Sequence, residues 1–152
     1  IYINDLDVGI SSDVSKFADD TKVGRVIRTE QDAGELQRDL EKLYEWTRKW
    51  QMEFNIGKCS VMSAGRNNPL HSYSLNDTPL GRSNCERDLG VLVSSDLRSR
   101  NQCLQARNRA NRVLGFISRS VSNRSAEVIL KLYLALVRPH LDYAVQVLVS
   151  VL

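Results

Sequence analysis

Two adjacent carboxylates, Asp19 and Asp20, are the residues of this 152-residue chain whose type and spacing most directly suggest chemistry. They follow an aromatic residue in the segment Phe17-Ala18-Asp19-Asp20. Acids held side by side on a rigid element suit a hard divalent cation such as Mg²⁺, which prefers oxygen ligands. An Asp-Asp dipeptide is also common in solvated turns, so the residues around it must decide between the two interpretations.

The sequence around the acidic pair predicts a β-hairpin. Residues 14–18 mix apolar and polar side chains, as expected for a half-buried strand, and residues 21–27 are rich in β-branched side chains. Adjacent acids repel one another and are unfavourable inside a strand. We therefore expect both acids at the tight turn of the hairpin, aimed at one point.

A long amphipathic helix is predicted over residues 32–50. Its N-terminus is ambiguous, because capping boxes can begin at Thr29 or at Asp32. Most of its charged side chains, Asp39 among them, fall away from the apolar stripe. The stripe consists of Leu36, Leu40, Leu43, Tyr44, Thr47 and Trp50. We expect Trp46 and Trp50 to lie in the core rather than to stack on nucleic-acid bases.

Short strands are predicted at residues 59–63, 73–75 and 89–93. The rest of the chain after these strands is predicted to be helical. The first C-terminal helix has an apolar face formed by Cys103, Ala106, Ala110, Val113, Leu114 and Ile117. Its arginines, Arg109, Arg112 and Arg119, are expected on the opposite face. A second helix begins at the capping residue Ser125 and is stopped or kinked by Pro139.

Charge is distributed unevenly along the chain. Residues 98–138 contain nine basic residues and one acid, Glu127, which leaves 12 of the 21 basic and 17 of the 18 acidic residues for the rest of the chain. This asymmetry favours a phosphate-facing surface near the C-terminus. The alternative is a solvated helix face, although such faces usually mix charges of both signs.

Neither a membrane span nor a secretory signal is predicted. The apolar runs are short and interrupted, and the first residues lack a basic start followed by a long apolar stretch. Three widely separated cysteines fit a reducing compartment better than a disulfide framework. We expect an intracellular protein of the nucleus or the cytoplasm that is not secreted.

Several blocks of this sequence, taken in order, resemble the reverse transcriptase of non-LTR retrotransposons. The similarity is to LINE elements of the chicken-repeat clade, which are jockey-like. The matching blocks are residues 1–6, 17–22, 54–59, 65–69, 87–93, 127–130 and 135–141. The resemblance implies an α+β fold, with a partial palm of antiparallel hairpin plus helix at residues 1–96 and a helical thumb at residues 97–152.

The resemblance also assigns roles to particular residues. Asp19 and Asp20 match the catalytic, metal-binding acids of the third polymerase motif. Lys58 matches the lysine that supports the leaving pyrophosphate, and its alternative is an exposed loop lysine. Leu89 and Gly90 match the primer-grip hairpin, whose backbone holds the primer end, and their alternative is an ordinary strand. Phosphate contacts in the thumb are implied for Arg109, Arg112 and Arg119.

The activity implied for the parent enzyme is RNA-directed DNA synthesis. Its partners are an RNA template, a DNA primer and deoxynucleoside triphosphates, and its cofactor is Mg²⁺, bound as two ions. Nothing in this chain matches the first-motif aspartate or the second-motif Gln-Gly. We therefore expect the chain to be inactive alone, with weak or absent Mg²⁺ binding, and to self-associate through an exposed sheet edge. The alternative is a non-catalytic RNA- or DNA-binding module that uses the basic C-terminal helices.

Overall fold

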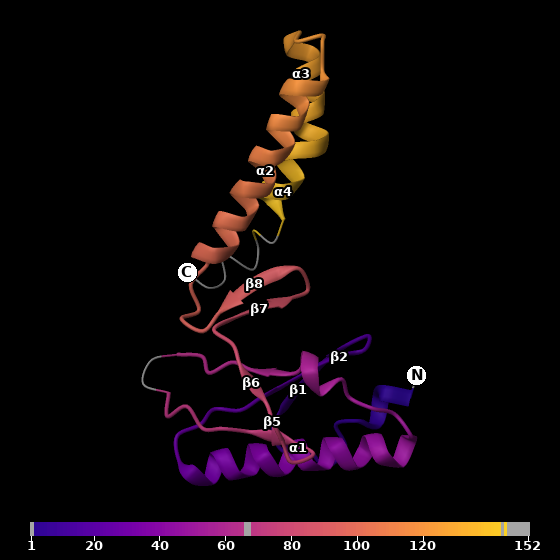
Figure 1. Ribbon diagram of the computed structural model, residues 1–152, viewed down its shortest axis with the longest axis vertical. Helices are drawn as coiled ribbons and strands as arrows, with labels where there is room; N and C mark the ends of the chain where they lie inside the picture. Colours follow the sequence, from indigo (N-terminus) through magenta and orange to yellow (C-terminus); the bar gives the residue numbers. More distant parts are fainter. Residues whose placement is uncertain (1, 66–67, 144, 146–152) are drawn as a thin grey trace. The chain divides into compact units, whose positions relative to one another are not determined.

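The computed structural model describes residues 2–65, 68–143 and 145. The chain forms two compact units, Ile1–Ser83 and Asn84–Leu152. Helices and small, mainly antiparallel sheets occur together, so the predicted α+β class is confirmed (Figure 1). The two units divide after residue 83, whereas the boundary between the palm-like and thumb-like regions was predicted after residue 96. The difference arises because the hairpin at residues 85–94 packs with the helices that follow it.

The predicted acidic hairpin is present in the first unit. A short 3₁₀ helix, Tyr2–Asp5, precedes strands β1 (Asp13–Phe17) and β2 (Asp20–Gly24). The strands pair antiparallel, with Phe17 opposite Asp20. Ala18 and Asp19 therefore form a two-residue turn, in which Ala18 has a φ of 53°. Only Asp19 lies within the turn, because Asp20 is already the first residue of β2.

Helix α1 spans Glu30–Trp50, two residues longer at its start than predicted. Of the two candidate capping boxes, the one at Thr29 forms. The Thr29 hydroxyl accepts a hydrogen bond from the Asp32 N–H at 3.3 Å, and the Asp32 carboxylate accepts one from the Thr29 N–H at 2.8 Å. The helix ends at Gln51, whose left-handed φ of 54° breaks the helical path.

The buried face of α1 differs from the predicted stripe in two respects. Its buried side chains are Ala33, Asp39, Leu43 and Thr47. Asp39 was expected on the polar face, but it is only 1% exposed. Trp50 was expected in the core, yet it is 39% exposed because it lies at the helix end. Trp46 is half-buried and donates a hydrogen bond from its indole to Asp5 at 3.0 Å.

Short strands follow α1. After a 3₁₀ turn at Ile56–Lys58 come β3 (Ser60–Val61), β4 (Ser74–Leu75), β5 (Thr78–Pro79) and β6 (Gly81–Arg82). Strand β4 pairs antiparallel with β5, and β3 pairs parallel with β6. The Gln37 side chain joins α1 to β4 through two hydrogen bonds to the Ser74 backbone, at 3.0 and 3.1 Å.

The second unit begins with a hairpin and continues as packed helices. Strands β7 (Cys85–Asp88) and β8 (Val91–Ser94) pair antiparallel. The predicted strand at residues 89–93 is wrong at its start, since Leu89 and Gly90 form the turn, with φ values of 46° and 85°. Helices α2 (Arg100–Ser120) and α3 (Ala126–Leu132), a π-helical segment (Tyr133–Val137) and α4 (Arg138–Asp142) follow.

These helices pack around Ala110, Ile117 and Val137, which are almost fully buried. The face predicted for α2 is correct at its centre and wrong at Cys103 and Leu114, which are exposed, while Gln102 is buried instead.

Pro139 does not stop the second helical stretch. The π-helical segment Tyr133–Val137 comes directly before it, and the chain continues into α4. The Arg138 N–H bonds to the Tyr133 carbonyl, five residues back, and Pro139 is the second residue of α4. A proline near a helix start lacks only an N–H that would otherwise have no intrahelical partner. Ser125 is the N-cap residue of α3, as predicted, although its side chain makes no capping bond.

In the described part of the chain no helix is both long and apolar enough to cross a bilayer.

Candidate functional site

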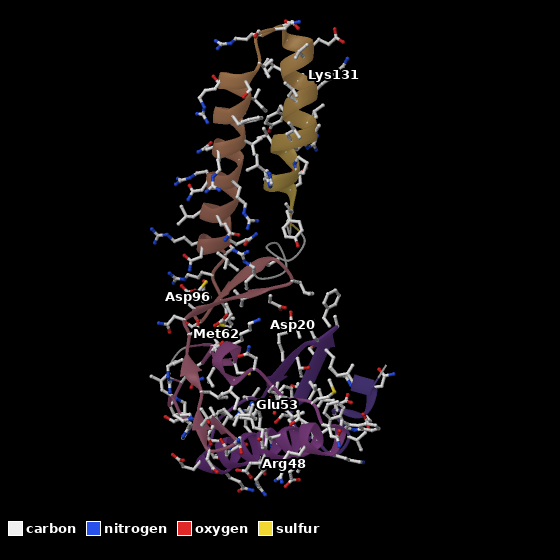
Figure 2. The ribbon with its side chains drawn as sticks, turned by 45° about the vertical axis from the view of Figure 1, so that its right-hand side comes forward. Asp20, Arg48, Glu53, Met62, Asp96 and Lys131 are labelled. Atoms are coloured by element: carbon white, nitrogen blue, oxygen red, sulfur yellow. The ribbon has the colours of Figure 1, made fainter. Side chains whose placement is uncertain are left out.

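The two acids of the hairpin are exposed to solvent. Asp19 lies in the turn and Asp20 opens β2, and Figure 2 shows Asp20 across the first unit from Arg48, which extends outward from α1. Among the described residues no group of three or more His, Cys, Asp or Glu side chains is placed to hold a metal ion. The hairpin therefore presents two carboxylates together, which is fewer ligands than a two-metal centre requires.

Lys16 anchors the hairpin on its inner face. Its ammonium group donates to the Ile3 and Asn4 carbonyls, at 3.2 and 3.1 Å, and to the Asp7 carboxylate at 2.6 Å. This hydrogen bond lowers the pKa of Asp7. Lys16 thus bonds two carbonyl groups of the preceding 3₁₀ helix. Since Lys16 belongs to β1, the hairpin that carries the acidic turn is tied to the 3₁₀ helix as well as held by the β1–β2 ladder.

Lys58 ends the 3₁₀ turn and is exposed. Within the described chain its ammonium group makes no hydrogen bond or ion pair. The structure thus places it in an accessible loop, and both interpretations of this lysine remain predictions.

The turn of the second hairpin is held by Tyr143. The Tyr143 hydroxyl donates to the Leu89 carbonyl at 2.7 Å. Gly90 has a φ of 85°, and a Cβ atom at this position would come within 2.7 Å of the same hydroxyl. Glycine is therefore required twice here, by conformation and by space. The Leu89 carbonyl is thus already occupied by Tyr143, and the primer-grip role of Leu89 and Gly90 stays a prediction.

Helix α2 carries a concentrated positive charge. It contains five arginines and no acid, namely Arg100, Arg107, Arg109, Arg112 and Arg119. None of the five forms an ion pair with another residue of the described chain. Arg112 and Arg119 are exposed, as expected, whereas Arg109 is half-buried and flanks the packed face instead of lying opposite to it. Unpaired guanidinium groups on one helix are suited to phosphate.

A polar cleft of about 570 Å³ lies between α2 and the β7–β8 hairpin. Cys85 and Leu92 line it from the hairpin. From α2 it is lined by Asn101, Leu104, Gln105, Asn108, Arg109 and Arg112. The Gln105 side-chain carbonyl oxygen is buried there without a hydrogen-bond donor from the described residues. Sequence reasoning missed Gln105 and Asn108, although their helical spacing from Arg109 and Arg112 was a signal that could have found them.

Asp39 was also missed, and its environment is structural. One oxygen of its carboxylate accepts hydrogen bonds of 2.8–3.0 Å from the backbone N–H and the hydroxyl of both Ser11 and Ser12. Lys42 donates to the other oxygen at 3.1 Å. Burial acts to raise the pKa of Asp39, but the hydrogen bonds from Ser12, Ser11 and Lys42 outweigh it and hold this pKa well below its ordinary value.

No protein-family model matches the chain, and no curated protein or solved structure does so either. The functional proposals therefore rest on the residues and their geometry.

Proposed function

We propose that this chain is palm and thumb sequence from the RNA-directed DNA polymerase of a non-LTR retrotransposon, and that it does not polymerise on its own. The observation that supports the proposal is the acidic hairpin, a two-residue turn that holds Asp19 beside Asp20 at the tip of two short strands. Its place in the chain adds support. It precedes the long helix α1, the second hairpin with its Leu89-Gly90 turn, and the arginine-rich helix α2.

The parent reaction joins a deoxynucleotide to a primer on an RNA template and needs two Mg²⁺ ions about 3.5–4 Å apart. The described residues do not fit this cofactor by themselves. Asp19 and Asp20 come from one hairpin, and no carboxylate from a second element joins them to make a cluster. Their chemical role would depend on a partner element, and the same is true of Lys58.

The 152-residue chain alone is expected to show no template-dependent incorporation of deoxynucleotides with Mg²⁺ or Mn²⁺. The physical reason is that two adjacent carboxylates cannot fix two cations in the required geometry. A primer-extension assay with an annealed DNA primer on RNA checks this. Incorporation that Asp19→Asn abolishes, and that Asp13→Asn at the start of the same hairpin leaves intact, would contradict the prediction.

The family assignment has a separate test at the level of the gene. If it is correct, the coding sequence immediately upstream of Ile1 contains, in frame or in a decayed form, an aspartate-bearing first motif and a Gln-Gly second motif. Upstream sequence with neither motif in any frame would argue against the assignment.

A second candidate function is nucleic-acid binding without chemistry. The observation that favours it is the charge of α2, where five arginines occur with no acid and without ion pairs to other described residues. Binding of this kind comes mainly from phosphate neutralisation, and it should depend steeply on salt and little on sequence. Titration of a labelled duplex at two salt concentrations tests it.

A further inference from the structure

Helix α2 presents an aromatic ring to solvent. Phe116 is 59% exposed, whereas its neighbour Ile117 is 5% exposed and packs with Ala110 and Val137 in the core of the unit. The π-helical segment and α4 pack along that core side of α2 (Figure 1). Successive residues of a helix point about 100° apart, so Phe116 lies on a flank of α2 that this packing leaves uncovered.

Two arginines flank the exposed ring. Arg112 precedes Phe116 by four residues and Arg119 follows it by three, and at these spacings helical side chains are neighbours. The helix contains no acid, and neither guanidinium forms an ion pair with another residue of the described chain. The ring therefore lies between two positively charged residues whose positions are about 10 Å apart along the helix axis.

Gly115 allows Arg119 to lie close to the helix beside this ring. A Cβ atom at residue 115 would come within 3.3 Å of the Arg119 guanidinium. The absent side chain therefore lets this cation approach the backbone one residue away from Phe116. The four residues are joined to one another by the spacings i+3 and i+4, and we call them the Phe116 patch. They are Arg112, Gly115, Phe116 and Arg119.

A ligand for the Phe116 patch has a flat uncharged group with anionic groups on either side. Single-stranded nucleic acid has this chemistry, because its bases can stack on aromatic side chains while a phosphate flanks each base. In a duplex the bases are already stacked on one another, so the ring would contact only the backbone. An anionic membrane surface also attracts arginines and aromatic rings, but a helix that inserts needs an apolar face, and Ala110 and Ile117 of α2 are already packed in the core.

We propose that the Phe116 patch binds single-stranded nucleic acid in preference to duplex. In the proposed contact a base stacks on Phe116, and the phosphates on its two sides contact Arg112 and Arg119. Ribose and deoxyribose strands share this chemistry, because stacking does not involve the sugar. The inference rests on the nucleic-acid binding proposed for α2 and names its substrate class.

The test measures binding of the full chain to labelled oligo(dT), oligo(rU) and a mixed-sequence duplex by fluorescence anisotropy at low salt. Phe116→Ala is expected to weaken binding of both single strands by about fivefold or more and to change duplex affinity by less than about twofold. Phe116→Leu keeps an apolar side chain without a ring and should lose as much, whereas Phe116→Trp should keep the wild-type affinity. Circular dichroism checks that each variant is folded, as expected for an exposed position.

The matched control is Leu130→Ala on α3. Leu130 is 57% exposed in the same unit and has no arginine three or four residues away. Its replacement removes a similar exposed apolar side chain and should leave the affinity for both single strands unchanged. A loss equal to that of Phe116→Ala would show that exposed apolar surface in general, and not the Phe116 patch, carries the binding.

Wild-type affinity for single strands in Phe116→Ala or Phe116→Leu would overturn the patch and leave nucleic-acid binding by α2 intact. An equal loss for single strands and duplex, or a loss confined to one of the two single strands, would also overturn it. Vesicles of phosphatidylserine and phosphatidylcholine provide the other arm. If Phe116→Ala weakens vesicle binding but not oligonucleotide binding, the patch contacts a membrane surface instead. Absence of binding to every nucleic acid at low salt would overturn both this inference and the proposed nucleic-acid binding.

Discussion

Replacement of Asp39 by alanine is expected to destabilise the unit Ile1–Ser83 by about 3 kcal/mol or more. The carboxylate is 1% exposed and receives two backbone and two hydroxyl hydrogen bonds from Ser11 and Ser12. Alanine would leave the buried Ser12 donors unpaired and remove the carboxylate partner of the Lys42 ammonium, which would keep only its hydrogen bond to the Gly9 carbonyl. The loss is large because each unpaired buried donor keeps the full cost of its desolvation.

Urea unfolding followed by tryptophan fluorescence measures this loss, since both tryptophans lie on α1 and report on the same unit. Glu45→Ala, at an exposed position of the same helix, is the control and should change the unfolding free energy by less than about 0.5 kcal/mol. Equal effects of the two substitutions would show that the Asp39 hydrogen bonds contribute nothing to the folded state.

The same carboxylate makes stability depend on pH in a definite direction. Its pKa is lowered in the folded state relative to the unfolded chain, where an aspartate titrates near 3.9. The contribution of Asp39 is therefore fully present above about pH 4 and is lost as the pH falls below that value. In Asp39→Ala the unfolding free energy should decline less steeply from about pH 4 to pH 2 than in the wild-type chain.

Replacement of Arg109, Arg112 and Arg119 together by glutamine is expected to weaken duplex binding by more than about tenfold at low salt. If each arginine neutralises one phosphate, the slope of log affinity against log salt should also become shallower by about 2.7. Fluorescence anisotropy with a labelled duplex at several salt concentrations gives both quantities.

The control for the arginines comes from cations of the same unit that are already paired. Lys131 bonds to Glu127 at 2.6 Å, and Arg138 bonds to Asp142 at 2.9 Å. The double variant Lys131→Gln, Arg138→Gln should change the slope much less, because the charges of these pairs largely cancel. An affinity that is independent of salt in the wild-type chain would remove phosphate neutralisation as the mechanism.

The features that could be predicted from the sequence are those whose determinants are local. The acidic hairpin was predicted from the β-branched residues after Asp20 and from the unfavourable place of adjacent acids inside a strand, although Lys16 and not Phe17 lies on its half-buried face. The start of α1 follows from the side chain of Thr29. The two-residue turn at Leu89 was missed because the apolar run at residues 91–93 was extended backwards into one strand, although Gly90 was a turn signal.

Features that depend on distant residues could not be predicted in the same way. Asp39 is three residues after Leu36 and four before Leu43, so its spacing placed it beside the apolar stripe and its charge led to the wrong expectation. Its hydrogen-bond donors Ser11 and Ser12, 28 and 27 residues earlier, could not be predicted from local pattern. The cleft likewise needs β8 beside α2, which no periodicity reveals. In the candidate site, the helical position of the three arginines was accessible from spacing, whereas the partial burial of Arg109 was not.

The strand pairing of this chain has a consequence for the order in which it folds. Three of the strand pairs are hairpins with two-residue turns, namely β1–β2, β4–β5 and β7–β8. Hairpins of this kind form within about 1–10 μs. The parallel pair β3–β6 instead closes a loop from Val61 to Arg82. Contacts of this kind must first offset the entropy of loop closure, so β3–β6 should form late. Val61→Ala would then accelerate unfolding of the first unit and leave its folding rate nearly unchanged in stopped-flow tryptophan fluorescence.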